Sequence, residues 1–221
     1  DINAMTGRET AVVYPAKDLM LGDVDSSSRE YVRRRLGVLY RMAAGQADIV
    51  CATPEGASQL TMPKDILLGL TRTIKSGDTL DLTELAARLT ALGYTRCDQI
   101  EGVSQFSVRG AIFDVFPVNF GAPVRIEMWD DTVDSISVFD IESQRRIDTI
   151  KNISIAPAAE IIFDSPTAFS DRLSAFSAKI RGKNAEIVKK HIAGDIEKLE
   201  NGVLPDSRSE EHTSELQSPL I

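Results

Sequence analysis

Three residues on two predicted strands have side chains suited to binding a partner: Arg109, Arg125 and Trp129, the only tryptophan of the chain. A guanidinium can pair with a carboxylate through two hydrogen bonds, and arginine and tryptophan are enriched among the residues that dominate binding energies. Because side chains alternate along a strand, Arg125, Glu127 and Trp129 are predicted to share one face of residues 124–129, with apolar residues on the other. Removing a side chain from such a solvent-exposed face is expected to change the stability of the fold little.

Residue chemistry leaves two interpretations of this arrangement open. In the first, Trp129 folds back onto a helix that follows Asp81, and Arg125 pairs with Glu127 or Asp131. In the second, the two arginines and the tryptophan form a surface that docks another protein.

No catalytic residue, metal site or cofactor site is predicted. The sequence contains no phosphate-binding GxxxxGK[ST] loop, no GxGxxG and no GxSxG. The adjacent carboxylates of Asp130 and Asp131 are expected to point in different directions, and His191 lies on a predicted surface helix. Cys51, in an apolar run, and Cys97, after a helix, are predicted to be reduced thiols, the first buried and the second half-buried.

Charge and hydropathy narrow the function further. The net charge of −8 and the pI of about 4.9 argue against DNA binding as the main role, because nonspecific nucleic-acid binding needs a basic face. No apolar run approaches the roughly 18 residues of a membrane span, and no signal peptide is visible. A cytoplasmic protein that does not bind membranes is therefore expected.

The pattern of elements divides the chain into four segments. Residues 1–67 alternate strand and helix, which is typical of the first part of a parallel α/β domain whose start is expected to lie upstream. Residues 68–156 combine a helix with several short strands joined by tight links, which predicts an α+β module with an antiparallel sheet. Residues 157–207 form a helical return segment. Residues 208–221 resemble the translation of a sequencing-library adapter and are expected to be non-native. The predicted fold class is thus α/β, an incomplete parallel domain interrupted by a small α+β module.

Local signals predict the element boundaries. The helix starts are a Ser27/Glu30 capping box, Thr53 followed by Pro54, and Asp81, and Gly93 is predicted to end the Asp81 helix. The predicted strands are a buried one at 48–53, one within 67–78, and the module strands 105–110, 111–116, 124–129, 133–139 and 147–155.

Four stretches resemble one known family. They are "YPAKDLMLGDVDSSSREYVRRRLGVLY", "VRGAIFDVFP", "PVRIEMWDDTVDSISVFDIESQRR" and "ISIAPAAE". They are similar to the N-terminal region of the bacterial transcription-repair coupling factors, from about Thr10 to Pro205. The second and third patterns are shared with the excinuclease B subunit, whose corresponding region is similar.

This resemblance implies a role for the module. In the family it docks on the excinuclease A subunit, and the family's docking arginines correspond to Arg109 and Arg125. The family's docking aromatic corresponds to Trp129, where tryptophan replaces a common phenylalanine. The implied function is recruitment of excinuclease A to stalled RNA polymerase in nucleotide excision repair.

The resemblance places other activities outside this fragment. The full-length protein would be an ATP-dependent DNA translocase that contacts RNA polymerase and DNA through other domains. One alternative is an N-terminal fragment of excinuclease B, a damage-loading ATPase. The chain lacks the tyrosine-rich hairpin expected for that subunit, and its phosphate loop is also absent. A structural α/β domain with no partner at this face is the other alternative.

Overall fold

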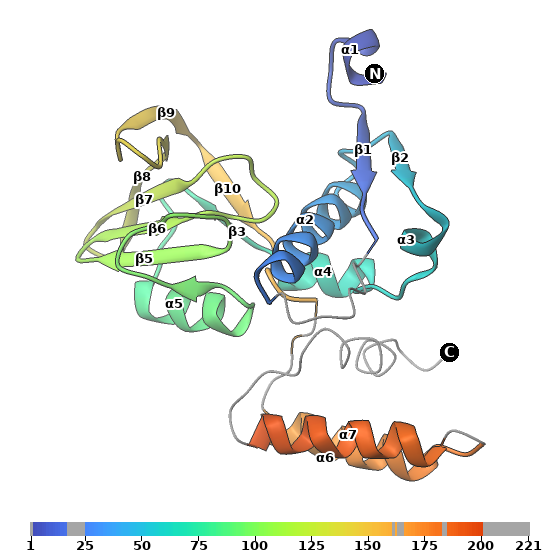
Figure 1. Cartoon of the computed structure of the whole chain (residues 1–221). Coiled ribbons are helices and arrows are strands. Elements are labelled where there is room, and N and C mark those ends of the chain that lie inside the picture. The colour runs from blue at the N-terminus through green and yellow to red at the C-terminus, as the bar shows by residue number, and fades with distance from the viewer. Residues whose placement is uncertain (1, 17–24, 161, 163–165, 183–184, 201–221) are drawn as a thin grey trace. The chain divides into compact units, whose positions relative to one another are not determined.

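The computed structural model describes residues 2–16, 25–160, 162, 166–182 and 185–200 (Figure 1). The chain divides into two compact units, residues 1–18, 22–59 and 64–159 in one and residues 19–21, 60–63 and 160–221 in the other. The segment boundaries predicted from the sequence stay a prediction.

The first elements of unit 1 alternate helix and strand. They are α1 (Ile2–Thr6), β1 (Ala11–Tyr14), α2 (Asp25–Ala43), β2 (Ile49–Ala52), α3 (Pro54–Ser58) and α4 (Lys64–Leu70). The strands β1 and β2 pair in parallel, as the order of elements predicts. In α2, Leu36 is fully buried and Arg35 lies over the ring of Tyr14.

The strand β2 is exposed, which corrects a prediction. All four of its residues, including Cys51, are exposed rather than buried. Within the described residues β2 has β1 as its one strand partner, so it is an edge strand of a two-stranded sheet. The apolar run alone could not distinguish an edge strand from a central one, because burial depends on the neighbours that a strand acquires.

Two of the three predicted helix starts are confirmed. Thr53 accepts a hydrogen bond from the Gly56 N–H at the start of α3, and Asp81 caps α5 (Leu82–Ala91) through the N–H groups of Thr83 and Glu84. The predicted capping box is wrong, because α2 begins at Asp25 and Ser27 therefore lies inside the helix.

Gly93 follows the C-cap of α5, at a position that requires glycine for two reasons. Its φ of +89° lies in the left-handed region, and a Cβ there would lie 2.6 Å from the Cβ of Ala159. The predicted C-terminal role of Gly93 is therefore confirmed.

Residues 67–78 contain a helix end as well as a strand. The structure places α4 over Lys64–Leu70 and β3 over Arg72–Lys75, so the prediction of a strand at Leu67–Leu70 is wrong. Over so short a run, the apolar residues fit the spacing of a helix as well as the alternation of a strand. In the structure Leu67 is buried on the helix.

The α+β module is built on a six-stranded sheet with the order β4-β5-β6-β7-β8-β9 (Figure 1). Its strands are β4 (Thr95–Arg96), β5 (Gln105–Arg109), β6 (Ile112–Val115), β7 (Val124–Trp129), β8 (Thr132–Phe139) and β9 (Arg146–Ile150). All neighbours pair antiparallel except β4 and β5.

The last predicted strand, 147–155, is two strands in different sheets. β9 ends at Ile150, and β10 (Asn152–Ile155) pairs antiparallel with β3. The single residue Lys151 separates them.

One face of the six-stranded sheet lies against α5 (Figure 1). The side chains on this face are apolar. Phe106 and Phe113 stack there with ring centroids 5.5 Å apart, and Leu85 and Leu89 of α5 are buried. The alternation on β7 places Ile126 on this same face, fully buried.

Unit 2 contains the helices α6 (Pro166–Lys179) and α7 (Ala185–Glu200). Phe169 and Leu173 of α6 pack with Ile192 of α7 in a small apolar core. The predicted fold class, α/β with a module built on an antiparallel sheet, is confirmed. In the described part of the chain, no helix is long and apolar enough to cross a membrane.

Candidate functional site

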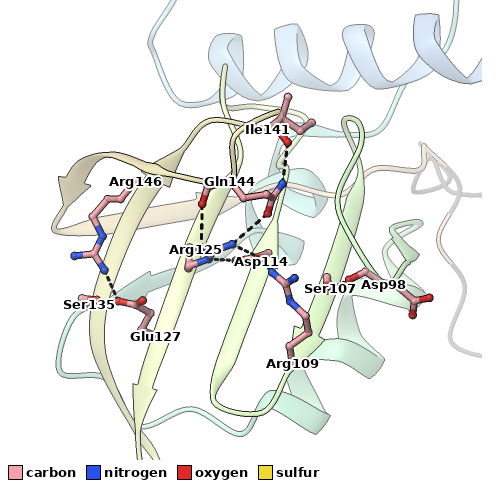
Figure 2. Close-up of polar contacts among 10 residues, drawn as sticks. All are labelled: Asp98, Ser107, Arg109, Asp114, Arg125, Glu127, Ser135, Ile141, Gln144 and Arg146. Carbon is pink, nitrogen blue, oxygen red and sulfur yellow. Dashed lines mark hydrogen bonds and ion pairs between the residues drawn. The ribbon is translucent and has the colours of Figure 1, made fainter.

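The second face of the six-stranded sheet carries charged side chains, and we call it the arginine face. It consists of Arg109 on β5, Asp114 on β6, and Arg125, Glu127 and Trp129 on β7. The strand register sets Asp114 directly opposite Arg125 and sets Glu127 opposite Ile112, which itself pairs with Arg109. Three neighbouring strands therefore bring these side chains to one side, and Figure 2 shows Arg109, Asp114, Arg125 and Glu127 among them.

Asp114 lies at the centre of the arginine face and is only 2% exposed. Arg125 donates from Nε to Oδ1 at 2.7 Å and from Nη2 to Oδ2 at 2.9 Å. Arg109 donates from Nη2 to Oδ2 at 2.6 Å. A buried carboxylate is costly unless it is paired and hydrogen-bonded, and these three bonds from two cations meet that need (Figure 2).

The Arg125 guanidinium is held from several sides. Besides Asp114, it donates to the carbonyl and the side-chain oxygen of Gln144, and it lies 4.7 Å from the ring centroid of Phe139. Hydrogen bonding to Asp114 is the main cause that raises the pKa of Arg125. Its side chain is 18% exposed. Arg125 is therefore a cation fixed within the sheet surface.

Arg109 is more open to solvent. Its side chain is 48% exposed, and it donates a hydrogen bond to Asp114. Arg109 also lines a pocket of about 420 Å³ together with Arg96, Cys97, Asp98 and Val108. Burial is the main cause that raises the pKa of the Cys97 thiol, so this half-buried cysteine is held in its neutral form.

Glu127 forms a second polar cluster on the arginine face. It accepts hydrogen bonds from Ser135 Oγ at 2.6 Å and from Nη2 of Arg146 on β9 (Figure 2). The hydrogen bond from Ser135 is the main cause that lowers the pKa of Glu127. Arg146, whose side chain is 49% exposed, is thus a third arginine beside the arginine face.

Trp129 projects into solvent at the end of β7, with 79% of its surface exposed. It pairs with Thr132 across a tight turn in which Asp130 has a φ of +58°. The interpretation in which Trp129 packs on the Asp81 helix is therefore wrong. Trp129 lies four positions after Arg125 along the strand, which is a distance of about 13 Å.

The structure brings together part of the predicted site. Arg109 and Arg125 meet at Asp114, whereas Trp129 shares their face at a distance. The alternative that paired Arg125 with Glu127 or Asp131 is wrong, because its partner is Asp114. Asp114 was not among the site residues predicted from the sequence. The signal was present as a carboxylate in the middle of the apolar run "IFDVF".

Among the described residues, no group of three or more His, Cys, Asp and Glu side chains is arranged to hold a metal ion. The adjacent Asp130 and Asp131 lie in the turn after β7. The arrangement as a whole suits recognition of a protein surface, through guanidinium groups and an exposed aromatic ring.

Comparison with known proteins supports this class. Residues 73–161 match the family model described as the UvrB interaction domain. Over 209 residues the chain is 31% identical to the transcription-repair-coupling factor of Bacillus subtilis (strain 168), which covers 91% of this chain and 18% of that protein. The factor of Myxococcus xanthus is 30% identical over 177 residues, 76% of this chain and 15% of that protein. The factor of Staphylococcus aureus (strain Mu50 / ATCC 700699) is 29% identical over 162 residues, which is 73% of this chain and 14% of that protein.

The α+β module is thus a UvrB interaction domain. The chain corresponds to the N-terminal region of the transcription-repair coupling factors, so the family predicted from the sequence is confirmed. It spans less than a fifth of the length of these three relatives, at most 18%.

Proposed function

We propose that this chain is a protein-interaction region that recruits the excinuclease A subunit to stalled RNA polymerase during transcription-coupled repair. The observation that carries the proposal is the arginine face of a UvrB interaction domain, where Trp129 is 79% exposed on the same strand as a fixed arginine. An exposed tryptophan contributes a large apolar area to an interface, and arginines pair with carboxylates of the partner.

The contact is made by three side chains. Arg109 and Arg125 provide the cationic part of the surface, and Trp129 provides the aromatic part. Arginine and tryptophan are enriched among the few interface residues that contribute about 2 kcal/mol or more each to binding.

The chain itself performs no catalysis in this proposal and uses no cofactor. ATP hydrolysis, DNA translocation and contacts to RNA polymerase belong to other parts of a full-length coupling factor, which acts in the cytoplasm. The relatives named above are all transcription-repair-coupling factors, which favours this family over excinuclease B.

Titration calorimetry of the chain with purified excinuclease A subunit tests the proposal. The parent chain is expected to bind, and the double variant Arg109→Ala/Trp129→Ala is expected to lose binding while it stays folded. Arg72→Ala is the matched control, because Arg72 is exposed on β3, outside the six-stranded sheet. The proposal fails if the parent does not bind, or if the double variant binds as well as the parent does.

A further inference from the structure

We infer that Asp114 is a positioning residue of the arginine face, which holds Arg125 as a fixed support and sets where Arg109 presents its guanidinium to the partner. This inference rests on the proposed function, because it concerns how the same docking surface is built. No role was predicted for Asp114 from the sequence.

The two arginines are held unequally. Arg125 donates four hydrogen bonds, two to Asp114 and two to Gln144, which leaves one of its five N–H groups. Arg109 donates one, to Asp114, and its side chain is 48% exposed against 18% for Arg125. A partner carboxylate that needs two parallel N–H groups can therefore be met by Arg109 and not by Arg125.

The buried carboxylate is what couples the two cations. Oδ2 of Asp114 accepts from Arg125 at 2.9 Å and from Arg109 at 2.6 Å, so a single oxygen contacts both guanidinium groups. Without that negative charge the two guanidinium groups would repel one another. Arg109, the more exposed of the two, would then swing away, and ordering it again would cost binding free energy.

A double-mutant cycle separates positioning from general support of the fold. The full chain and its variants Asp114→Asn, Arg109→Ala and the double variant are titrated with purified excinuclease A subunit. We expect Asp114→Asn to weaken binding about 10-fold and Arg109→Ala about 30-fold. The loss caused by Asp114→Asn should be clearly smaller in the Arg109→Ala background than in the parent, because residues that act through one another are not additive. An equal loss from Asp114→Asn in both backgrounds, or no loss in the parent, overturns the inference.

Asp114→Glu is a second variant that tests the same inference if Asp114→Asn does not fold. It keeps the negative charge and moves the carboxylate by one methylene. As a change to a positioning residue it should weaken binding in the parent, and weaken it clearly less in the Arg109→Ala background. An equal effect in the two backgrounds contradicts the inference.

A measurement without the partner distinguishes failure of this inference from failure of the proposed function. In the free ¹⁵N-labelled chain, rotation of the Arg109 guanidinium should be slow by nuclear magnetic resonance, and it should become fast in Asp114→Asn. The exposed Arg72 provides the reference for fast rotation. Fast rotation of Arg109 in the parent overturns the role of Asp114. Absence of binding by a parent whose Arg109 is held would overturn the proposed function instead.

Discussion

Arg125 and Asp114 form a two-point ion pair across adjacent strands, with Nε to Oδ1 at 2.7 Å and Nη2 to Oδ2 at 2.9 Å. The strand register places the two residues directly opposite one another on β7 and β6. This geometry makes Arg125 part of the folded sheet as well as of its surface. The expectation that each of the three predicted docking residues could be removed without affecting folding therefore needs revision for Arg125.

The two arginines are predicted to differ in their effect on stability. Arg125→Ala leaves the buried Asp114 with one cation, so the free energy of unfolding should fall by about 3 kcal/mol. Arg109→Ala should cost about 1 kcal/mol or less, because its half-exposed ion pair is screened by solvent. Urea denaturation of both variants measures the difference. Equal losses would show that Asp114 does not depend mainly on Arg125.

Trp129→Ala is predicted to affect binding without affecting folding. The side chain is 79% exposed, so the free energy of unfolding should change by no more than about 0.5 kcal/mol. Binding to the excinuclease A subunit should weaken by about 2 kcal/mol, roughly 30-fold. The matched control is Ile187→Ala on α7, where a 60% exposed apolar side chain lies outside the module. A large fall in melting temperature for Trp129→Ala would contradict its placement in solvent.

Glu127 is predicted to make the stability of the module depend on pH. Its pKa is lowered in the folded chain, chiefly by the hydrogen bond from Ser135, so folding favours the ionised carboxylate. This contribution is fully present above the ordinary glutamate pKa of about 4.3 and is lost as the pH falls through the lower folded value. Glu127→Gln should therefore show a shallower fall in unfolding free energy than the parent between about pH 5 and pH 3. Identical slopes in denaturant titrations would rule this contribution out.

Gly93→Ala is predicted to be more destabilising than Gly77→Ala. Both glycines have a φ of +89°, so an L side chain costs about 1 kcal/mol of backbone strain at either position. At Gly93 a Cβ would also lie 2.6 Å from the Cβ of Ala159 and 2.9 Å from its backbone nitrogen, whereas no atom lies within 4 Å at Gly77. Chemical denaturation should show a further loss of about 1 kcal/mol or more for Gly93→Ala. Equal losses would mean that the Ala159 segment moves aside.

DNA binding by the isolated chain is predicted to be weak. The net charge of −8 opposes the phosphate backbone, and Asp114 and Glu127 offset arginines on the arginine face. The dissociation constant for duplex DNA at physiological salt should be about 10⁻⁴ M or weaker. Fluorescence anisotropy with labelled duplex measures it. Micromolar binding that falls steeply with added salt would contradict the prediction.

Local chemistry accounts for what could be predicted from the sequence by itself. The alternation on β7 put Ile126 inside and Trp129 outside, because successive strand side chains point to opposite faces. Thr53 and Asp81 could be predicted as helix starts, because the hydrogen bonds that a capping side chain accepts come from backbone N–H groups two or three residues further along the chain. The family motifs around Arg109 and Arg125 rest on the same short-range order of residues.

Only the tertiary structure decided which residues meet. Asp114 lies opposite Arg125 because β6 pairs with β7 in one register, which the packing of the apolar face selects over the whole sheet. For the same reason residues 147–155 divide between two sheets, and β2 is exposed although its residues are apolar. The alternation of side chains along a strand determines which face of the sheet each residue occupies. Whether an arginine on that face stays exposed or pairs with a buried carboxylate depends on strand partners far along the chain.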